Sequence, residues 1–183
     1  ELTLDDASLL GDPALRRRIG YMPQIGRFPD HLRVGQLFDL MREIRRGTHN
    51  RTDEDLIKSF QIDRIAHQTA RTLSGGTRQK VSACLAFLFD PDVLVLDEPT
   101  AGLDPVSVEI LKEKVRAEIA RGKLILLTSH ILSDLDEIAT DVLYLIDGKA
   151  QFYRPIGELK SASGETRLGR IIAIANTYDD YCN

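Results

Sequence analysis

The chain has 183 residues, of which 43% are apolar and 28% charged, and its formal net charge is −4. This length suits one ordinary globular domain or most of one, and the acidic balance argues against a nucleic-acid-binding protein that works through bulk electrostatics. No run of about 18 apolar residues occurs, which argues against a membrane-spanning helix. The two cysteines, Cys84 and Cys182, form neither a metal pattern nor a disulfide framework, so we expect a reducing, cytoplasmic setting.

The first half of the chain predicts one short strand and three helices. The strand is IGYM (19–22), and the helical segments are VGQLFDLMREIRR (34–46), DEDLIKSF (53–60) and TRQKVSACLAFLFD (77–90). Helical spacing places four apolar side chains of the third helix on one face, namely Val81, Cys84, Leu85 and Leu88. The polar loop GTHNRT (47–52) joins the first two helices. We therefore expect a helical insertion within an α/β domain.

The second half predicts neighbouring strands of a parallel sheet. VLVL (93–96) and LILLT (124–128) are apolar runs without alternation, which is typical of central strands covered on both faces. The segment between them predicts a helix that Asp104 caps, that Pro105 opens and that Gly122 ends. Such a strand–helix–strand unit is almost always right-handed.

The last third predicts a hairpin and a helical tail. VLYLI (142–146) runs into Asp147-Gly148 and then KAQFY, which indicates two antiparallel strands at an edge. The tail includes the helical segment GETRLGRIIAIAN (164–176). The predicted parts of the chain are an N-terminal part of the core (1–24), the helical insertion (25–90), the rest of the core (91–153) and the tail (154–183).

Polar side chains follow both apolar strands. Asp97 and Glu98 come directly after VLVL, at the carboxyl edge where α/β sheets bind ligands. Successive strand residues point opposite ways, so one carboxylate can hold Mg²⁺ while the other orients or deprotonates an attacking water. His130 follows the next strand and predicts a contact with a γ-phosphate. The alternative for the acids is an ordinary solvated strand-to-loop junction, and for His130 a surface or capping residue.

A glycine turn opens the third helix. In LSGGTRQK (73–80), Ser74, Gly75 and Gly76 leave backbone N–H groups and the positive helix end open to an anion such as a phosphate. The alternative is a simple capped helix start, with Ser74 or Thr77 as the cap. Gln24, just after the first strand, would by itself be an ordinary loop residue. Only its occurrence together with the acids, His130 and the glycine turn indicates a functional role.

Together these residues resemble the ATP-binding subunit of an ABC transporter, over roughly residues 15–150. The family's motifs occur in their usual order: a Q-loop glutamine (Gln24), the LSGG signature (73–76), the Walker B acids (Asp97 and Glu98), a D-loop (Ala101 to Asp104) and an H-loop histidine (His130). The resemblance implies an α/β fold, a RecA-like P-loop NTPase core with a mostly parallel sheet, into which an α-helical subdomain is inserted. In the family an antiparallel β subdomain precedes these parts.

The resemblance also implies roles, cofactors and partners. Two copies would sandwich two ATP molecules head to tail, with Ser74, Gly75 and Gly76 of one copy touching the nucleotide of the other. The chain's own site would comprise four residues, Gln24, Asp97, Glu98 and His130. Glu98 would be the general base, Asp97 and Gln24 would hold Mg²⁺, and Asp104 would lie across the dimer interface. A transmembrane permease would dock in a groove between core and helical subdomain, which places the protein on the cytoplasmic face of the membrane.

The chain lacks two features that precede the Q-loop in the family, the P-loop and the aromatic residue that stacks on adenine. No G-x-x-x-x-G-K-[ST] stretch, the P-loop, occurs in the 183 residues, and in the family it precedes the Q-loop. Much of the antiparallel β subdomain is missing as well, and the first residue is not Met. We therefore expect a sequence that begins within a protein, hydrolyses no ATP by itself and leaves apolar surface exposed.

A narrower resemblance concerns the stretches 21–46 and 72–105. They are similar to the ATPase of the copper-processing ABC system used in the maturation of nitrous-oxide reductase, and TRQK after LSGG is distinctive. Two other functions stay open. One is a P-loop-less binding or regulatory module that offers LSGG to a complete partner. The other is a relative acting in translation or DNA repair, although residues 25–72 leave no room for a second ATPase half or a long coiled coil.

Overall fold

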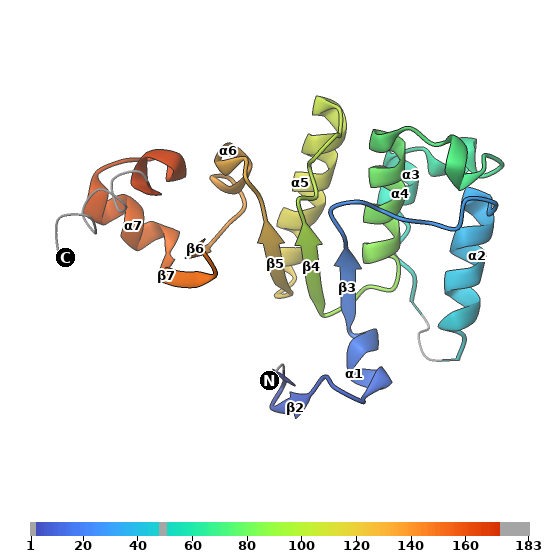
Figure 1. Cartoon of the computed structure of the whole chain (residues 1–183), viewed down its shortest axis with the longest axis horizontal. Helices are drawn as coiled ribbons and strands as arrows, with labels where there is room; N and C mark the ends of the chain where they lie inside the picture. The colour runs from blue at the N-terminus through green and yellow to red at the C-terminus, as the bar shows by residue number, and fades with distance from the viewer. Residues whose placement is uncertain (1–2, 48–50, 173–183) are drawn as a thin grey trace. The chain divides into compact units, whose positions relative to one another are not determined.

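The computed structural model describes residues 3–47 and 51–172 and divides into two units, the first ending at Thr128 and the second beginning at Ser129 (Figure 1). Its elements are β1 (Thr3–Leu4), β2 (Ala7–Ser8), α1 (Pro13–Arg17), β3 (Ile19–Met22), α2 (Val34–Ile44), α3 (Asp55–Ser59), η1 (Ile62–Ile65), η2 (Ala70–Thr72), α4 (Gly75–Phe87), β4 (Val93–Asp97), α5 (Pro105–Ala120), β5 (Leu124–Thr128), α6 (Leu132–Leu135), β6 (Asp141–Ile146), β7 (Lys149–Pro155) and α7 (Ile156–Ser163). Residues 48–50 of the predicted polar loop, and 173–183 of the predicted tail with Cys182, lie outside the described residues.

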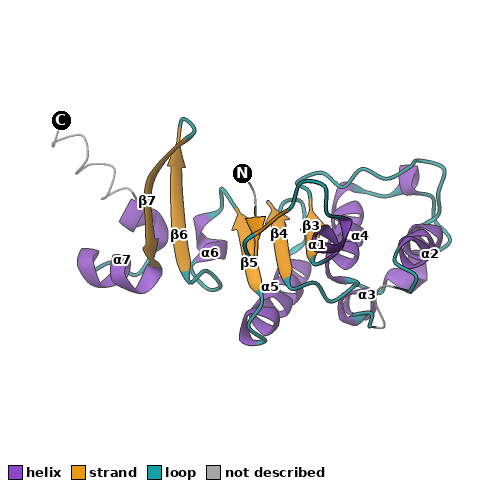
Figure 2. Cartoon of the chain, turned by 90° about the horizontal axis from the view of Figure 1, so that it is seen from below, coloured by secondary structure: helices purple, strands orange, loops and turns teal. Residues whose placement is uncertain are grey.

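The first unit is built on a three-stranded parallel sheet in the order β3-β4-β5. This confirms the three predicted strands and the parallel pairing of 93–96 with 124–128. The register places Met22 opposite Leu96 and Asp97 opposite Thr128, and Met22 and Leu96 are fully buried. Because parallel strands run the same way, their carboxyl ends share one edge of the sheet. Figure 2 shows the three strands side by side with α5 on one side of them.

The opposite face of this sheet is uncovered. Tyr21, Val95 and Leu126 are cross-strand partners on that face, and the side chains of Tyr21 and Leu126 are 57% and 56% exposed. Leu124, on the same face of β5, is 63% exposed. The prediction that residues 124–128 form a central strand covered on both faces is therefore wrong for the first unit, in which β5 is the last strand of the sheet and Leu124 and Leu126 are exposed. The predicted exposure of apolar surface is confirmed.

The predicted helices of the insertion are present as α2, α3 and α4. From the predicted apolar face of α4, Val81, Cys84 and Leu88 are buried. Because α4 contacts β3, α2 and α3, its burial also extends beyond that face. Leu85, from the predicted face, is only half-buried, whereas Ala83, Ala86 and Phe87 are buried. The helix between the strands is confirmed as α5, which Asp104 caps by accepting the backbone N–H of Ser107 at 3.0 Å.

The second unit is a hairpin packed on short helices. β6 and β7 pair antiparallel around Asp147 and Gly148, both with positive φ, which confirms the predicted hairpin. Its core consists of four buried side chains, Val142, Ile156, Leu168 and Ile172. α7 forms the first part of the predicted tail, while the four predicted chain segments stay predictions. Among the described helices, none has the length and apolar character that a membrane crossing requires.

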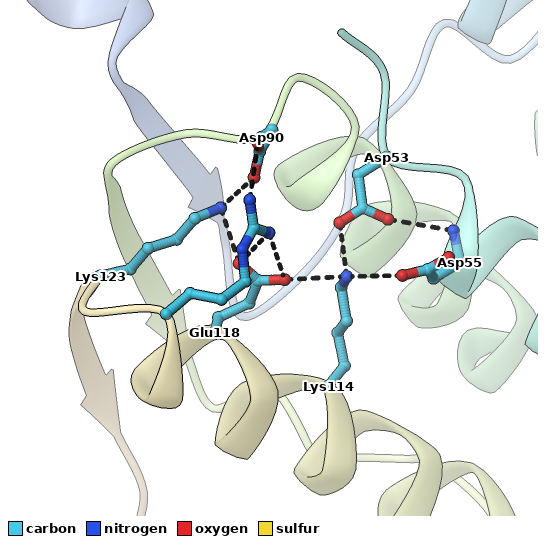
Figure 3. A network of polar contacts seen from close by, with 7 residues as sticks. Asp53, Asp55, Asp90, Lys114, Glu118 and Lys123 are labelled. Atoms are coloured by element: carbon cyan, nitrogen blue, oxygen red, sulfur yellow. Dashed lines mark hydrogen bonds and ion pairs between the residues drawn. The ribbon is translucent and has the colours of Figure 1, made fainter.

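A buried ammonium group joins the helical insertion to α5. Lys114 on α5, with only 8% of its side chain exposed, pairs with Asp53, with Asp55 at 3.1 Å and with Glu118 at 2.9 Å (Figure 3). Asp53 and Asp55 lie at the start of α3, so this contact ties two distant segments of the chain. Burial disfavours the charged form, but the hydrogen bonds that Lys114 donates to Asp53, Glu118 and Asp55 outweigh it and raise the pKa of Lys114.

The same network continues past the end of α5. Glu118 is 1% exposed and also pairs with Arg121 at 2.8 Å and Lys123 at 2.7 Å. Arg121 and Lys123 both also pair with Asp90, which follows α4, and the Arg121–Asp90 distance is 2.9 Å. The hydrogen bond from Arg121, helped by the one from Lys123, lowers the pKa of Asp90 to about 2. Asp90, Asp53 and α5 are thus held together by charge pairs rather than by apolar packing alone.

We expect Lys114→Met to lower the free energy of unfolding by about 3 kcal/mol, because it leaves the buried carboxylates of Asp53 and Glu118 without their shared cation. Urea titration followed by circular dichroism measures this. Lys58→Met, at an exposed position on α3, serves as the control and should change stability by less than about 0.5 kcal/mol. Equal effects of the two substitutions would contradict a structural role for the network.

Candidate functional site

The carboxyl edge of the sheet brings the predicted acids together with a threonine. Asp97 is the last residue of β4 and lies opposite Thr128, the last residue of β5. The Thr128 hydroxyl donates a hydrogen bond to Oδ1 of Asp97 at 2.6 Å. Asp97 is half-buried, and carboxylate oxygens are the ligands that Mg²⁺ takes from proteins. Asp97 therefore fits a magnesium ligand at this edge.

Glu98 adopts an unusual backbone conformation directly after Asp97. Its φ is +47°, in the left-handed region that costs a side-chain-bearing residue of the order of 1 kcal/mol. Its N–H donates to the backbone oxygen of Thr128 at 3.2 Å and to the Thr128 hydroxyl at 3.1 Å. Its carbonyl oxygen accepts from Ala101 N at 3.1 Å and from Gln79 Nε2 at 3.4 Å. Neighbouring elements therefore fix the backbone of the residue predicted to be the general base.

The two other predicted residues of the chain's own site follow the sheet's carboxyl ends. Gln24 is exposed and lies two residues beyond β3, the neighbour of β4. His130 is exposed, follows β5 by two residues and belongs to the second unit. The edge formed by β3, β4 and β5 thus carries Gln24, Asp97 and Glu98, and the place of His130 in the site stays a prediction.

The LSGG turn combines a helix cap with an open glycine. Ser74 caps α4 by accepting the backbone N–H of Thr77 at 3.2 Å, so the alternative of a capped helix start applies as well. A Cβ on Gly76 would lie 2.7 Å from the carbonyl oxygen of Gly102. The close packing against Gly102 therefore explains why residue 76 is a glycine. A Cβ on Gly75 would meet nothing within 4 Å, and its φ is not left-handed. Within the described residues no contact requires glycine at position 75, so the start of α4 is open at this point.

Asp104 is engaged within its own chain. It caps α5 through Ser107 and pairs with Lys80 of α4 at 2.7 Å. The hydrogen bond from Lys80, followed by those from Ser107, holds the pKa of Asp104 well below its usual range. The loop between β4 and α5 is therefore tied to the helix that begins with LSGG. The predicted contact of Asp104 across a dimer interface stays a prediction.

Three polar residues of this region were missed by the sequence reasoning. Thr128 ends an apolar run, and a single hydroxyl at a strand's carboxyl end was its only signal. Lys80 and Gln79 lie in a polar stretch of the third helix, where Gln79 nonetheless has only 4% of its surface exposed. Its partner is 19 residues away in the sequence, so no periodic pattern marks it.

A cavity of about 310 Å³ lies between β3, α2 and α4. Its lining is apolar and basic, with no acidic residue among the described residues that form it, and includes Arg17, Arg27, Arg45, Phe28, Met41 and Phe89. The Arg45 guanidinium lies 5.1 Å from the Phe89 ring centroid and donates to the backbone oxygen of Arg17. Burial, together with the nearby charge of Arg17, lowers the pKa of Arg45. The cavity thus combines apolar walls with unbalanced positive charge.

Curated relatives of the chain include several ATPases. It is 31% identical over 137 residues to the Nod factor export ATP-binding protein I of Ralstonia nicotianae, covering 73% of this chain and 43% of that protein. It is 32% identical over 151 residues to an uncharacterized ABC transporter ATP-binding protein of Bacillus subtilis, covering 81% and 63%. A phospholipid-transporting ATPase of Homo sapiens is 31% identical over 154 residues, which are 82% of this chain and 9% of that protein. The chain thus spans less than two thirds of the length of each.

Solved structures share the fold. The ATP-binding subunit of an ABC transporter matches with a TM-score of 0.79 at 24% identity, over 88% of this chain and 69% of that one. An ATP-binding cassette solved as a dimer with ADP and Pi matches with a TM-score of 0.66 at 22% identity, over 78% and 65%. The predicted α/β fold class is confirmed.

We expect Gly76→Ala to lower the free energy of unfolding by about 2 kcal/mol, because the added methyl group is forced against the Gly102 carbonyl. Gly75→Ala, one residue earlier, is the matched control and should be neutral or stabilise by about 0.5 kcal/mol, because its methyl group enters open space. Thermal unfolding of the two variants checks this. A Gly75 variant as unstable as the Gly76 variant would mean that the turn packs differently.

The motif order, the parallel sheet and the acids at its carboxyl edge agree with one further comparison. The family model described as "ABC transporter" matches residues 1–101, more than half of the chain. The chain belongs to the ABC transporter ATP-binding family.

Proposed function

We propose that the chain is part of the ATP-hydrolysing motor subunit of an ABC transporter and acts as a head-to-tail homodimer. Gly75 carries this proposal. It stands beside the Ser74 cap at the start of a 13-residue helix, and its Cβ position is open. Ser74, Gly75 and Gly76 would contact a phosphate of the nucleotide that the other copy binds. The dimer with ADP and Pi among the structural relatives supports this arrangement.

The chain's own nucleotide would lie at the carboxyl edge of the sheet. Asp97, with the Gln24 side chain, would hold Mg²⁺, whose chemistry there is to neutralise charge on the phosphates. Glu98 would accept a proton from the attacking water, with His130 beside the γ-phosphate. The 183 residues contain no P-loop lysine, so this polypeptide by itself should not turn over ATP.

A permease would dock at the cavity between β3, α2 and α4. Its apolar walls suit a short helix, and its arginines suit an acidic residue on that helix. The protein would then be peripheral on the cytoplasmic face of the membrane, without a role in nucleic-acid binding.

In trans complementation tests the homodimer. In a chimaera that places the P-loop segment of the Bacillus subtilis relative before Glu1, Glu98→Gln and Gly75→Asp should each lower ATP turnover by about 100-fold or more. A mixture of the two variants should regain turnover, because one composite site then has both an intact Glu98 and an intact Gly75. Gly157→Ala, where an added Cβ also meets nothing within 4 Å, is the control. No recovery in the mixture would contradict a signature that serves the partner's nucleotide.

A second and more specific proposal concerns the cargo of the transporter. The stretches 21–46 and 72–105, with TRQK after LSGG, support a copper-processing system for nitrous-oxide reductase maturation. Loss of the gene in a denitrifying host should leave the reductase without its full copper content, measured by metal analysis. A normally metallated reductase would contradict this cargo.

The alternative is a P-loop-less module that offers LSGG to a complete ATPase. The intact LSGG signature, the acids Asp97 and Glu98 and His130 argue against a long decay toward such a module. An intact mass of 20.5 kDa for the protein isolated from its source would support this alternative, and a larger mass would support the motor subunit.

A further inference from the structure

The backbone of Glu98 is held from two different elements. From β5, Thr128 accepts the Glu98 N–H through both its backbone oxygen and its hydroxyl, at 3.2 and 3.1 Å. From α4, the Gln79 side chain donates to the Glu98 carbonyl oxygen at 3.4 Å. Each polar group of the Glu98 backbone therefore bonds a side chain far away in the sequence, in addition to backbone bonds with Thr128 and Ala101.

These hydrogen bonds hold Glu98 in a strained backbone conformation. A glutamate at φ +47° stays in the left-handed region only when its surroundings over-determine it. The direction of a side chain follows from its backbone conformation. Whatever holds the Glu98 backbone therefore also constrains the direction in which its side chain leaves the main chain.

Thr128 serves both acids through one hydroxyl group. The hydroxyl donates to Asp97 Oδ1 at 2.6 Å and accepts the N–H of Glu98. A hydroxyl group can do both at once, whereas valine, which has nearly the same shape, can do neither. The relative placement of the two carboxylates is thus set by the end of β5.

Gln79 brings the signature helix into the same arrangement. Its side chain is 4% exposed, and a buried amide needs hydrogen-bond partners. The helix meets the loop after Glu98 at two more places, where Gly76 approaches Gly102 and where Lys80 pairs with Asp104. A displacement of the start of α4 would therefore be passed to the Glu98 carbonyl.

We infer that Gln79 and Thr128 are positioning residues that set the direction of the Glu98 carboxylate, and that Gln79 makes this direction respond to the signature turn. The inference rests on the proposed function in that Ser74 to Gly76 face the partner's nucleotide and Glu98 faces the chain's own. Each copy then links its two nucleotide contacts through α4, so that one site of the dimer influences the acid of the other.

The first test uses the 183-residue chain and amide hydrogen exchange resolved by NMR. Thr128→Val should speed exchange of the Glu98 amide about three- to tenfold, and Thr128→Ser should restore it. Gln79→Met should speed exchange at Ala101, whose N–H shares the Glu98 carbonyl. Ser82→Ala, buried on the same helix, is the control. Unchanged exchange at Glu98 and Ala101 in both folded variants would overturn the inference.

The second test uses the chimaera and separates positioning from folding. Thr128→Val and Gln79→Met should lower kcat about tenfold or more with little change in KM for ATP, and Thr128→Ser should retain activity. Equal loss in the Thr128→Ser variant would overturn the role of the hydroxyl. Failure of the complementation experiment, with the exchange effects present, would overturn the proposed dimer and leave the positioning role intact.

Discussion

The buried charge pair of Lys114 with Asp53 and Glu118 holds the first unit together. It fixes the start of α3 on α5, and through Glu118, Arg121 and Lys123 it reaches Asp90 at the end of the α4 segment. Because Asp53, before α3, and Asp90, after α4, are both held on α5, α4 keeps a defined position beside β3. The approach of Gly76 to Gly102, and of Gln79 to Glu98, requires that position.

The sequence predicted the parts of the fold that local pattern and capping control. VLVL became β4, the hairpin formed at Asp147-Gly148, and Asp104 capped α5 as expected. It predicted that both faces of residues 124–128 are covered, which is wrong for the first unit. An apolar run indicates a strand that is suited to burial, but it does not show that other elements cover that strand. The sequence did not predict that the burial of α4 extends beyond one face, because that burial comes from three elements packed around one helix.

The sequence predicted the charged residues of the candidate site, but not the hydrogen bonds and ion pairs that position them. Asp97 and Glu98 follow an apolar strand, and a glycine pair opens a helix; both are local signals. The bonds from Thr128 to both acids, from Gln79 to Glu98 and from Lys80 to Asp104 join positions 19 to 31 residues apart. Such pairs have no period, so they emerge only once the chain is folded. The two copies of a dimer would thus communicate through residues that no motif marks.

The strand pairings also differ in how much chain they enclose. β4 and β5 are joined by α5 alone, whereas β3 and β4 enclose residues 23–92 with the entire helical insertion. Closing a longer loop adds little to the equilibrium cost but slows the search for the partner strand. Compact helices held by Lys114 bring the ends of that loop together. We therefore expect the pairing of β3 with β4 to depend on this ionic network more than the pairing of β4 with β5 does.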